Sequence, residues 1–337
     1  MPLGYFINIE YTPSAMSLSI SDMRNKIKEN NILIVIGGPT ASGKTSLAVA
    51  LAHHLQGQII SADSRQIYKG LTIGSGKDLD EYTFAGKSIP YHCIDIASPE
   101  EVFTLFDYLI AAKEALEKIK QSADVPILCG GTGLYIEALL KDYQIPPVKE
   151  DIDLRLSLKN ASKEELLEKL SKLSLSLANK TDCTSKKRLI RAIEIATYTK
   201  ALPSQTKPSS AQKNKLIPLV ILTDFSKENL IKRIDNRVEQ RLKEGMIDEV
   251  KQLIDNGITL NRLTQLGMEY GTIGSYLFNK TDYNEMVLTL KNNIHRLAKR
   301  QRTWFRGTTR RGIKTHTISG NSFDEALELI TEFLNHF

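Results

Sequence analysis

The segment from Ile32 to Thr45 constrains the fold of this chain more than any other. It reads ILIVIGGPTASGKT, a short apolar run followed by Gly38-x-x-x-x-Gly43-Lys44-Thr45. This is the spacing of a P-loop, in which glycines let successive backbone N–H groups turn toward an anion. A helix predicted over 44–55 adds the positive end of its dipole. The segment therefore predicts a strand, a phosphate-binding loop and a helix, rather than a glycine-rich turn alone.

A P-loop identifies polyphosphate as the ligand class but leaves the reaction open. Lys44 is expected to give the phosphates a positive charge, and Thr45 to offer its hydroxyl to Mg²⁺, the expected cofactor. The residues predicted to bind phosphate are Gly38, Pro39, Thr40, Ala41, Ser42, Gly43, Lys44 and Thr45.

Strand, glycine turn and helix recur along the chain. A strand predicted over 58–60 leads into Ser61–Gln66, and one over 126–129 meets Gly130–Gly133. Further strands are predicted over 90–96 and 216–223, and helices over 103–121, 134–140, 226–256 and 289–308. This alternation predicts an α/β fold, a P-loop NTPase-like parallel sheet flanked by helices.

The composition changes after Lys141, where Pro146 and Pro147 mark a boundary. A polar helical stretch and a loop over 203–215 then precede the last predicted core strand, which indicates an inserted all-helical domain. The expected parts are a leader outside the core over 1–30 with a short helix near 20–28, core segments over 31–141 and 216–320, the insert over 142–215, and a C-terminal helix over 321–337.

Bulk properties exclude several classes of protein. Hydrophobic residues make up 41% of the 337 residues, and no apolar run approaches the ~20 residues that span a membrane. The first residues show no signal peptide. Three cysteines, Cys93, Cys129 and Cys183, lack metal-binding spacing, which favours a reducing compartment over a disulfide framework or zinc site. We expect a cytoplasmic protein without a membrane partner, and a monomer by default.

Two polar residues follow predicted strands. Asp63 comes after the strand that we place beside the P-loop strand, where a carboxylate could take a proton from an incoming nucleophile. Its alternative role is a helix N-cap, and placement alone favours neither. Thr132 lies in a glycine turn, where its hydroxyl could contact a leaving-group oxygen or an amine, or could cap a helix.

Two basic patterns point to anionic ligands. Arg233, Arg237 and Arg241 share a helix face, and Arg237 is predicted to contact phosphate, although acidic neighbours also fit a solvated face. Residues 287–315 hold nine Lys or Arg and no acid, interleaved with aromatic residues. This pattern is typical of nucleic-acid binding rather than a mixed-charge solvated face. The predicted contacts are Arg296, Lys299 and Arg300.

Several motifs together resemble the tRNA dimethylallyltransferase family, over 34–307. They are GGPTASGKT, SADSRQIYKGLTIG, IPYHCIDI, PILCGGTGLYIEALL, KKRLIRAIEI, RVEQRLKEGMIDEV and LAKRQRTWFRG. The P-loop alone is unspecific, whereas its combination with SADS-x-Q-x-Y and GGTGLY is highly specific. The chain departs from the family pattern at Leu266–Tyr270, at Asn292–His295, at Thr184-Ser185, and where IGSGKD replaces IGTAKP.

The resemblance implies transfer of a dimethylallyl group from dimethylallyl diphosphate to N6 of adenosine 37 beside the tRNA anticodon. It implies that Asp63 is the general base, that Thr132 contacts the amine and the leaving group, that Arg237 and the P-loop bind diphosphate with Mg²⁺, and that the insert grips the anticodon stem-loop. The tRNA contacts that it implies are Asp63, Ser64, Arg65, Gln66, Arg155, Lys187, Arg188, Leu189, Ile190 and Arg191.

Three other functions remain open from the sequence. An adenylate prenyltransferase acting on AMP or ATP would share the fold and the chemistry. A P-loop kinase is disfavoured because Gly-Gly-Thr stands where a metal-binding Asp is common. An inactive RNA-binding protein is disfavoured because Lys44, Thr45, Asp63 and Thr132 are all present.

Overall fold

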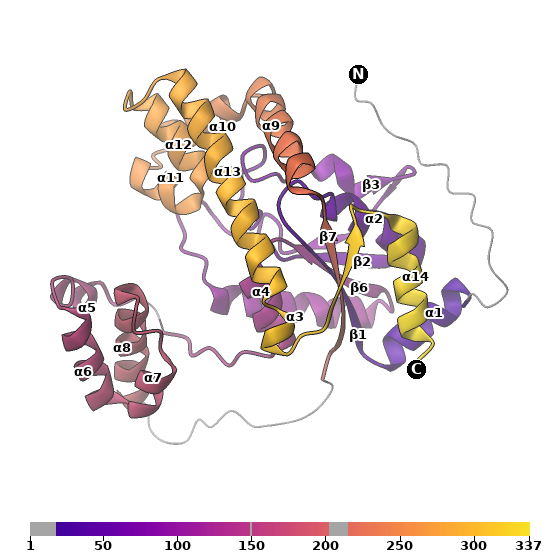
Figure 1. Cartoon of the computed structure of the whole chain (residues 1–337), viewed down its shortest axis with the longest axis horizontal. Coiled ribbons are helices and arrows are strands. Elements are labelled where there is room, and N and C mark those ends of the chain that lie inside the picture. The colour runs from indigo at the N-terminus through magenta and orange to yellow at the C-terminus, as the bar shows by residue number, and fades with distance from the viewer. Residues whose placement is uncertain (1–17, 149, 202–214) are drawn as a thin grey trace. The chain divides into compact units, whose positions relative to one another are not determined.

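The structure is a computed structural model that describes residues 18–148, 150–201 and 215–337. It divides into two compact units (Figure 1). The first comprises the described parts of Met1–Asp142 and Asn214–Phe337, and the second those of Tyr143–Lys213. The loop predicted over 203–215 lies outside the described residues except for Lys215.

Six parallel strands form the main sheet of the first unit, in the order β5-β2-β6-β1-β7-β8. Their bounds are β1 Ile32–Gly37, β2 Gly57–Ser61, β5 Tyr91–His92, β6 Val125–Gly130, β7 Ile217–Asp224 and β8 Thr315–Ser319, and a small hairpin pairs β3 Thr83–Phe84 with β4 Lys87–Ser88. Every residue of β1 and β6 is buried, as expected of parallel strands covered by helices on both faces.

The strand order corrects one prediction. We placed Asp63 after the strand beside the P-loop strand, but β6 and β7 flank β1, and β2 lies one strand further out. Sequence order does not reveal this arrangement, because parallel strands are joined by crossovers that can skip a place. Parallel strands nevertheless end at one edge, so Asp63 still emerges on the same side of the sheet as the P-loop.

The helices of the first unit pack on this sheet and on one another. They are α1 Ile20–Glu29, α2 Lys44–Leu55, α3 Leu105–Gln121, α4 Gly133–Leu140, α9 Lys227–Lys243, α10 Met246–Asp255, α11 Leu260–Leu266, α12 Met268–Leu277, α13 Tyr283–Arg306 and α14 Phe323–Leu334, with short 3-10 turns at Leu79–Tyr82 and Thr309–Arg311. No helix among the described residues is long and apolar enough to cross a membrane.

The described residues 18–30 correct the prediction of a leader outside the core, while its first part, over 1–17, lies outside the described residues. Met23 and Ile27 of α1 are buried in the main hydrophobic core, and α1 packs against β1 and α14. Figure 1 shows α1 and α14, from opposite ends of the chain, side by side. The packing of α1 on the core was hard to predict because its sequence is mostly polar, and only two apolar side chains, four residues apart, point inward.

One other predicted element is shorter than expected. The strand predicted over 90–96 is limited to Tyr91–His92, because Cys93 and Asp95 have φ angles of 61° and 55°, which break an extended strand. The helices predicted over 226–256 are α9 and α10, and Gly245, whose φ is 98°, separates them. The short strand β8 was not predicted.

In the described part of the second unit, all regular elements are helices. Its helices are α5 Ile152–Ser157, α6 Lys163–Leu173, α7 Leu175–Lys180 and α8 Lys186–Ala201. Leu166 and Leu170 of α6 pack with Leu189 and Ile193 of α8 in a separate small core. Ser162 and Glu165 form a capping box at the start of α6, which fixes where that helix begins.

Candidate active site

A cavity of about 260 Å³ lies at the carboxyl ends of β1, β2 and β6. Residues from the P-loop, from the segments after β2 and β6, and from α9, α12 and α13 line it. Nine of the predicted site residues meet there, namely Thr40, Lys44, Thr45, Asp63, Ser64, Arg65, Gln66, Thr132 and Arg237. The carboxyl edge of a parallel sheet is the usual place for a ligand in such folds.

At two positions of the P-loop, the backbone conformation and the space available permit only glycine. Gly43 has a φ of 73°, and Gly38 has a φ of 150° with its missing Cβ position only 2.5 Å from the carbonyl oxygen of Thr223. Ser42 fixes the loop through hydrogen bonds with Thr223 and with the Pro39 carbonyl oxygen. No side chain caps the start of α2, so its first-turn N–H groups are available to an anion.

The ammonium group of Lys44 lies inside the cavity. Its Nζ donates to the carbonyl oxygen of Pro39 at 2.7 Å. Burial lowers the pKa of Lys44, while the charge of Asp63 acts in the opposite direction. A bound anion would likewise favour the charged form, so the site is suited to a negatively charged ligand.

The three arginines of α9 have two different roles. Arg233 Nε donates to the carbonyl oxygen of Ala41 at 2.7 Å, and its guanidinium lies 4.5 Å from the centre of the Phe225 ring. Arg233 therefore supports the P-loop from outside. Arg237 and Arg241 line the cavity, and burial lowers the pKa of Arg241. The shared helix face was predicted, but Arg241 was not selected as a ligand contact.

Neither the Asp63 nor the Thr132 side chain caps a helix in the structure, although Thr132 occupies the N-cap position of α4. No helix begins after Asp63, whose Oδ1 accepts a hydrogen bond from the Arg65 N–H at 2.9 Å. Thr132 precedes α4, but its side chain makes no capping bond. Instead, Thr132 Oγ1 accepts from the Ser64 N–H at 3.1 Å, and the Thr132 N–H donates to the Ala62 carbonyl oxygen at 3.0 Å.

These bonds join the segment after β2 to the segment after β6. A Cβ on Gly130 would lie 2.2 Å from the Ala62 carbonyl oxygen, so only glycine permits this approach. The two candidate residues from different strands are thereby held at the edge of one cavity.

Sequence analysis missed Gln301 of α13. Its Oε1 accepts from the Thr40 N–H at 2.8 Å, and its Nε2 donates to the Gly131 carbonyl oxygen at 3.0 Å. One amide therefore connects the P-loop to the glycine turn after β6. Gln301 lies among the basic residues of α13. Their charge predicted nucleic-acid binding and gave no sign that this uncharged residue contacts the P-loop.

The basic residues of α13 face several directions. Arg296 and Lys299 line a separate groove of about 400 Å³ between α9 and α13, not the candidate active-site cavity, and Arg300 is exposed. Acidic residues outside the helix offset part of the charge: Arg302 pairs with Asp224 at 3.0 Å, and Lys291 with Glu239 at 2.7 Å. Sequence alone could not show these pairs, because the partners lie more than 50 residues away.

In the second unit, the predicted tRNA contacts differ in exposure. Lys187 and Arg188 are exposed. Arg155 and Arg191 both pair with Glu194, at 2.6 and 2.9 Å. Leu189, also predicted as a tRNA contact, has its side chain fully buried in the core of this unit.

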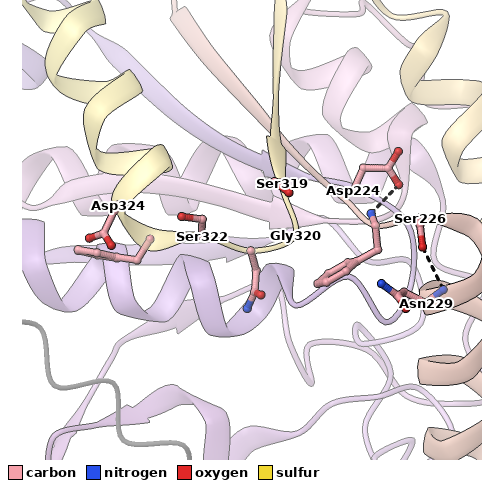
Figure 2. Close-up of a pocket in the computed structure, with 10 residues that line it drawn as sticks. Asp224, Ser226, Asn229, Ser319, Gly320, Ser322 and Asp324 are labelled. Atoms are coloured by element: carbon pink, nitrogen blue, oxygen red, sulfur yellow. Dashed lines mark hydrogen bonds between the residues drawn. The ribbon is translucent and has the colours of Figure 1, made fainter.

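A larger cavity of about 680 Å³ lies at the carboxyl ends of β7 and β8, beside the start of α14. Figure 2 shows Asp224, Ser226 and Asn229 on one side of it and Ser319, Gly320, Ser322 and Asp324 along the other. Two of these side chains are used locally, since Asp224 accepts from the Phe225 N–H and Ser226 from the Asn229 N–H. None of the predicted catalytic or phosphate-binding residues lines this cavity, so its size does not make it the candidate active site.

Glu269, in the first turn of α12, is an acid that sequence analysis did not select. It lines the candidate active-site cavity but is only 7% exposed. The nearest cation is Arg65, whose Nε lies 3.7 Å from Glu269 Oε2, and neither of these atoms has a hydrogen-bond partner among the described residues. Burial raises the pKa of Glu269, and Arg65 acts against this shift.

Substitution Glu269→Gln is expected to stabilise the protein at neutral pH. Because burial raises the folded-state pKa of Glu269 above its usual 4.5, the wild-type protein loses stability as pH rises from about 4.5 to the raised folded-state pKa, whereas glutamine does not titrate. We expect the melting temperature of the variant to be higher than that of the wild-type protein at pH 7, and the difference to shrink as pH falls toward 4.5. Thermal unfolding of both proteins from pH 4 to pH 8 measures this. A variant that is less stable throughout the series would contradict the expectation.

Comparison with known proteins decides the family. The family model described as IPP transferase matches residues 66–308. The chain belongs to the IPP transferase family. The matched segment includes Thr132, Arg237 and Gln301, whereas the P-loop and Asp63 precede it.

Relatives of this IPP transferase extend the similarity toward the N-terminus. The chain is 44% identical over 306 residues to tRNA dimethylallyltransferase 2 of Bacteroides fragilis, covering 90% of this chain and 98% of the relative. It is 46% identical over 286 residues to tRNA dimethylallyltransferase 1 of Azobacteroides pseudotrichonymphae, covering 85% and 92%. The crystal structure of the full-length tRNA isopentenylpyrophosphate transferase of Bacillus halodurans is 31% identical with a TM-score of 0.62, covering 91% and 96%.

Proposed function

We propose that this protein is a tRNA dimethylallyltransferase that transfers a dimethylallyl group from dimethylallyl diphosphate to N6 of adenosine 37, beside the anticodon, and releases diphosphate. Family membership and the names of the relatives support the reaction class. The observation that carries the proposal for this chain is that Asp63, Thr132, Lys44 and Arg237 line one cavity.

The P-loop side of the cavity is proposed to bind the diphosphate of the donor. The first-turn N–H groups of α2, the Lys44 ammonium and the Arg237 guanidinium all favour an anion. When the bond between C1 of the dimethylallyl group and the diphosphate oxygen breaks, its electron pair stays on the diphosphate. These groups would stabilise the charge that develops there.

A magnesium ion fits this side of the cavity. The Thr45 hydroxyl lines it beside Lys44, and an uncharged oxygen together with phosphate oxygens and water is a donor set that Mg²⁺ accepts. Thr45 would hold the ion, which when bound supplies further positive charge to the diphosphate.

The opposite wall is proposed to act on the acceptor. The exocyclic amine of adenosine is a weak nucleophile because its lone pair is delocalised into the ring, so both a base and close positioning are needed. As the bond between N6 and C1 forms, the N6 proton would pass to the Asp63 carboxylate. Thr132 Oγ1 already accepts from the Ser64 N–H, and among the described residues its own proton has one acceptor, the distant Ser64 Oγ at 3.4 Å. That proton is therefore suited to a leaving-group oxygen.

The acceptor is proposed to be the anticodon stem-loop of a tRNA. An adenosine must leave its stack to enter so small a cavity, which costs a few kcal/mol. Contacts between cationic side chains and RNA phosphates would offset this cost. The proposed cationic contacts are Arg65, Arg155, Lys187, Arg188, Arg191, Arg296, Lys299 and Arg300. We further propose that the enzyme acts as a monomer in the cytoplasm.

A transfer assay tests the proposed function. Labelled dimethylallyl diphosphate with Mg²⁺ is offered with an anticodon stem-loop carrying adenosines at positions 36–38, and separately with AMP and ATP. We expect label on the stem-loop and none on the free nucleotides. A stem-loop with inosine at position 37, which lacks the amine, is the matched control and should remain unlabelled. Label on AMP or ATP alone would instead support an adenylate prenyltransferase.

A further inference from the structure

The loop over 72–78, between β2 and the 3-10 turn at Leu79–Tyr82, is fixed by a partly buried hydrogen-bond network outside the mechanism described above. The carboxylate of Glu249, on α10, accepts from the N–H groups of Thr72, Ile73 and Gly74 at 2.9, 2.6 and 3.0 Å. It also accepts from the Tyr270 hydroxyl at 2.9 Å. The start of the loop therefore has little freedom to move.

A buried lysine fixes the other end of this loop. The Lys77 side chain is fully buried, and its Nζ donates to the Tyr68 carbonyl oxygen at 2.7 Å and to Asp95 Oδ1 at 2.5 Å. A buried ammonium group is expensive unless it is paired and hydrogen-bonded, so this arrangement holds the Lys77 backbone in one place. The residue that follows is Asp78.

Asp78 joins two cations of the candidate active site. Its Oδ2 lies 2.5 Å from Arg237 Nη2 and 3.4 Å from Arg241 Nη2. The two arginines are one helical turn apart on α9, and both line the cavity. One carboxylate oxygen therefore holds two guanidinium groups side by side and offsets their mutual repulsion.

Gly76 makes this approach possible. A Cβ on Gly76 would lie 2.5 Å from Arg241 Nη2 and 3.1 Å from Arg237 Nη2, and its φ of 73° already disfavours other residues. The loop and the arginines are thus built to fit closely. Each guanidinium carries five N–H donors, so bonds to one oxygen leave several donors for another anion.

We propose that Asp78 is a positioning residue for the diphosphate donor, holding Arg237 and Arg241 aligned at the cavity so that the diphosphate meets two pre-oriented guanidinium groups. The inference rests on the proposed function, since it deepens the assignment of the diphosphate site. Long arginine side chains are otherwise free to adopt many rotamers, and a ligand that fixes them on binding loses affinity through their lost entropy. Side chains that are already fixed before the ligand binds avoid this entropy cost. The negative charge of Asp78 also offsets part of the positive charge of Arg237 and Arg241. Removing Asp78 should therefore weaken diphosphate binding if Asp78 mainly positions the arginines, and strengthen it if Asp78 mainly neutralises them.

Binding of inorganic pyrophosphate distinguishes the two effects. Isothermal titration with pyrophosphate and Mg²⁺ is compared for the wild-type protein, Asp78→Ala and Asp78→Asn. We expect the alanine variant to bind about tenfold more weakly, the order of magnitude for one charge-assisted hydrogen bond. The asparagine variant should stay within about threefold of wild type, because its amide oxygen still accepts from both arginines. Asp80→Asn, an exposed site two residues away, is the charge-matched control and should have no effect.

Several outcomes would overturn the proposal. Tighter pyrophosphate binding by both Asp78 variants would identify Asp78 as a competitor of the diphosphate. Unchanged binding by Asp78→Ala would mean that Asp78 does not position Arg237 and Arg241 for the diphosphate. In the transfer reaction, we expect Asp78→Ala to raise the KM for the donor about tenfold with kcat within about threefold, a split that a general loss of folded protein would not produce.

The titration separates failure of this inference from failure of the proposed function. If wild-type protein binds pyrophosphate and Asp78→Ala binds equally well, the inference fails while the diphosphate site stands. If wild-type protein binds no pyrophosphate, the diphosphate site itself is wrong and the inference falls with it. Binding that follows our expectation without any transfer to the stem-loop would support the inference and overturn the proposed acceptor.

Discussion

Substitution Asp63→Asn is expected to lower kcat for prenyl transfer by about 10²–10⁴-fold, the range typical of losing a general base. Asparagine cannot take the N6 proton, yet its side-chain oxygen can still accept the hydrogen bond from the Arg65 N–H that Asp63 accepts at 2.9 Å. The loop after β2 should therefore keep its shape. Single-turnover rates with saturating donor and stem-loop measure the effect on the chemical step directly.

Binding measurements show whether the lower rate of Asp63→Asn comes from the chemical step or from weaker binding of the substrates. Pyrophosphate affinity and stem-loop affinity of Asp63→Asn should stay within about threefold of wild type, because the P-loop and the basic side chains are unchanged. Asp80→Asn removes the same charge from an exposed position that does not line the cavity and should retain full activity. A rate for Asp63→Asn above one tenth of wild type would mean that another group takes the proton.

The parts of this site that could be predicted from sequence are those encoded locally. The P-loop spacing determines a backbone conformation within a few residues, since Gly43 supplies its positive φ and α2 begins at Lys44. The glycine turn after β6 likewise contains the residue that allows the close approach to Ala62. In such segments the sequence pattern and the local structure carry the same information.

The parts that could not be predicted depend on contacts between distant segments. Gln301 joins the P-loop to Gly131, and Glu249 joins α10 to the loop after β2, but neither residue belongs to a recognisable local motif. The direction of a charged side chain on α13 depends on which helices pack against it. Arg296 and Arg302 therefore had the charge expected of RNA contacts, while only the fold shows that both line the groove beside α9.

Substitution Lys44→Met is expected to lower kcat/KM for the donor by about 10²–10³-fold, as when one preorganised group that stabilises developing charge is removed. Methionine is of similar length and can fill the partly buried space, so the main loss is the positive charge in the cavity and the bond from Nζ to the Pro39 carbonyl oxygen. Pyrophosphate should also bind more weakly. Steady-state kinetics with varied donor, together with pyrophosphate titration, measure both losses.

The pH dependence of pyrophosphate binding provides a second signature of Lys44. Burial lowers its pKa below the usual 10.5, so the wild-type site loses this positive charge at a lower pH than an exposed lysine would. Wild-type affinity should therefore fall more steeply than that of Lys44→Met as pH rises from 7 to 10, since the ionisation of pyrophosphate itself is common to both proteins. Lys69→Met, at an exposed position, should follow the wild-type curve. Parallel curves for wild type and Lys44→Met would show that Lys44 does not bind the diphosphate.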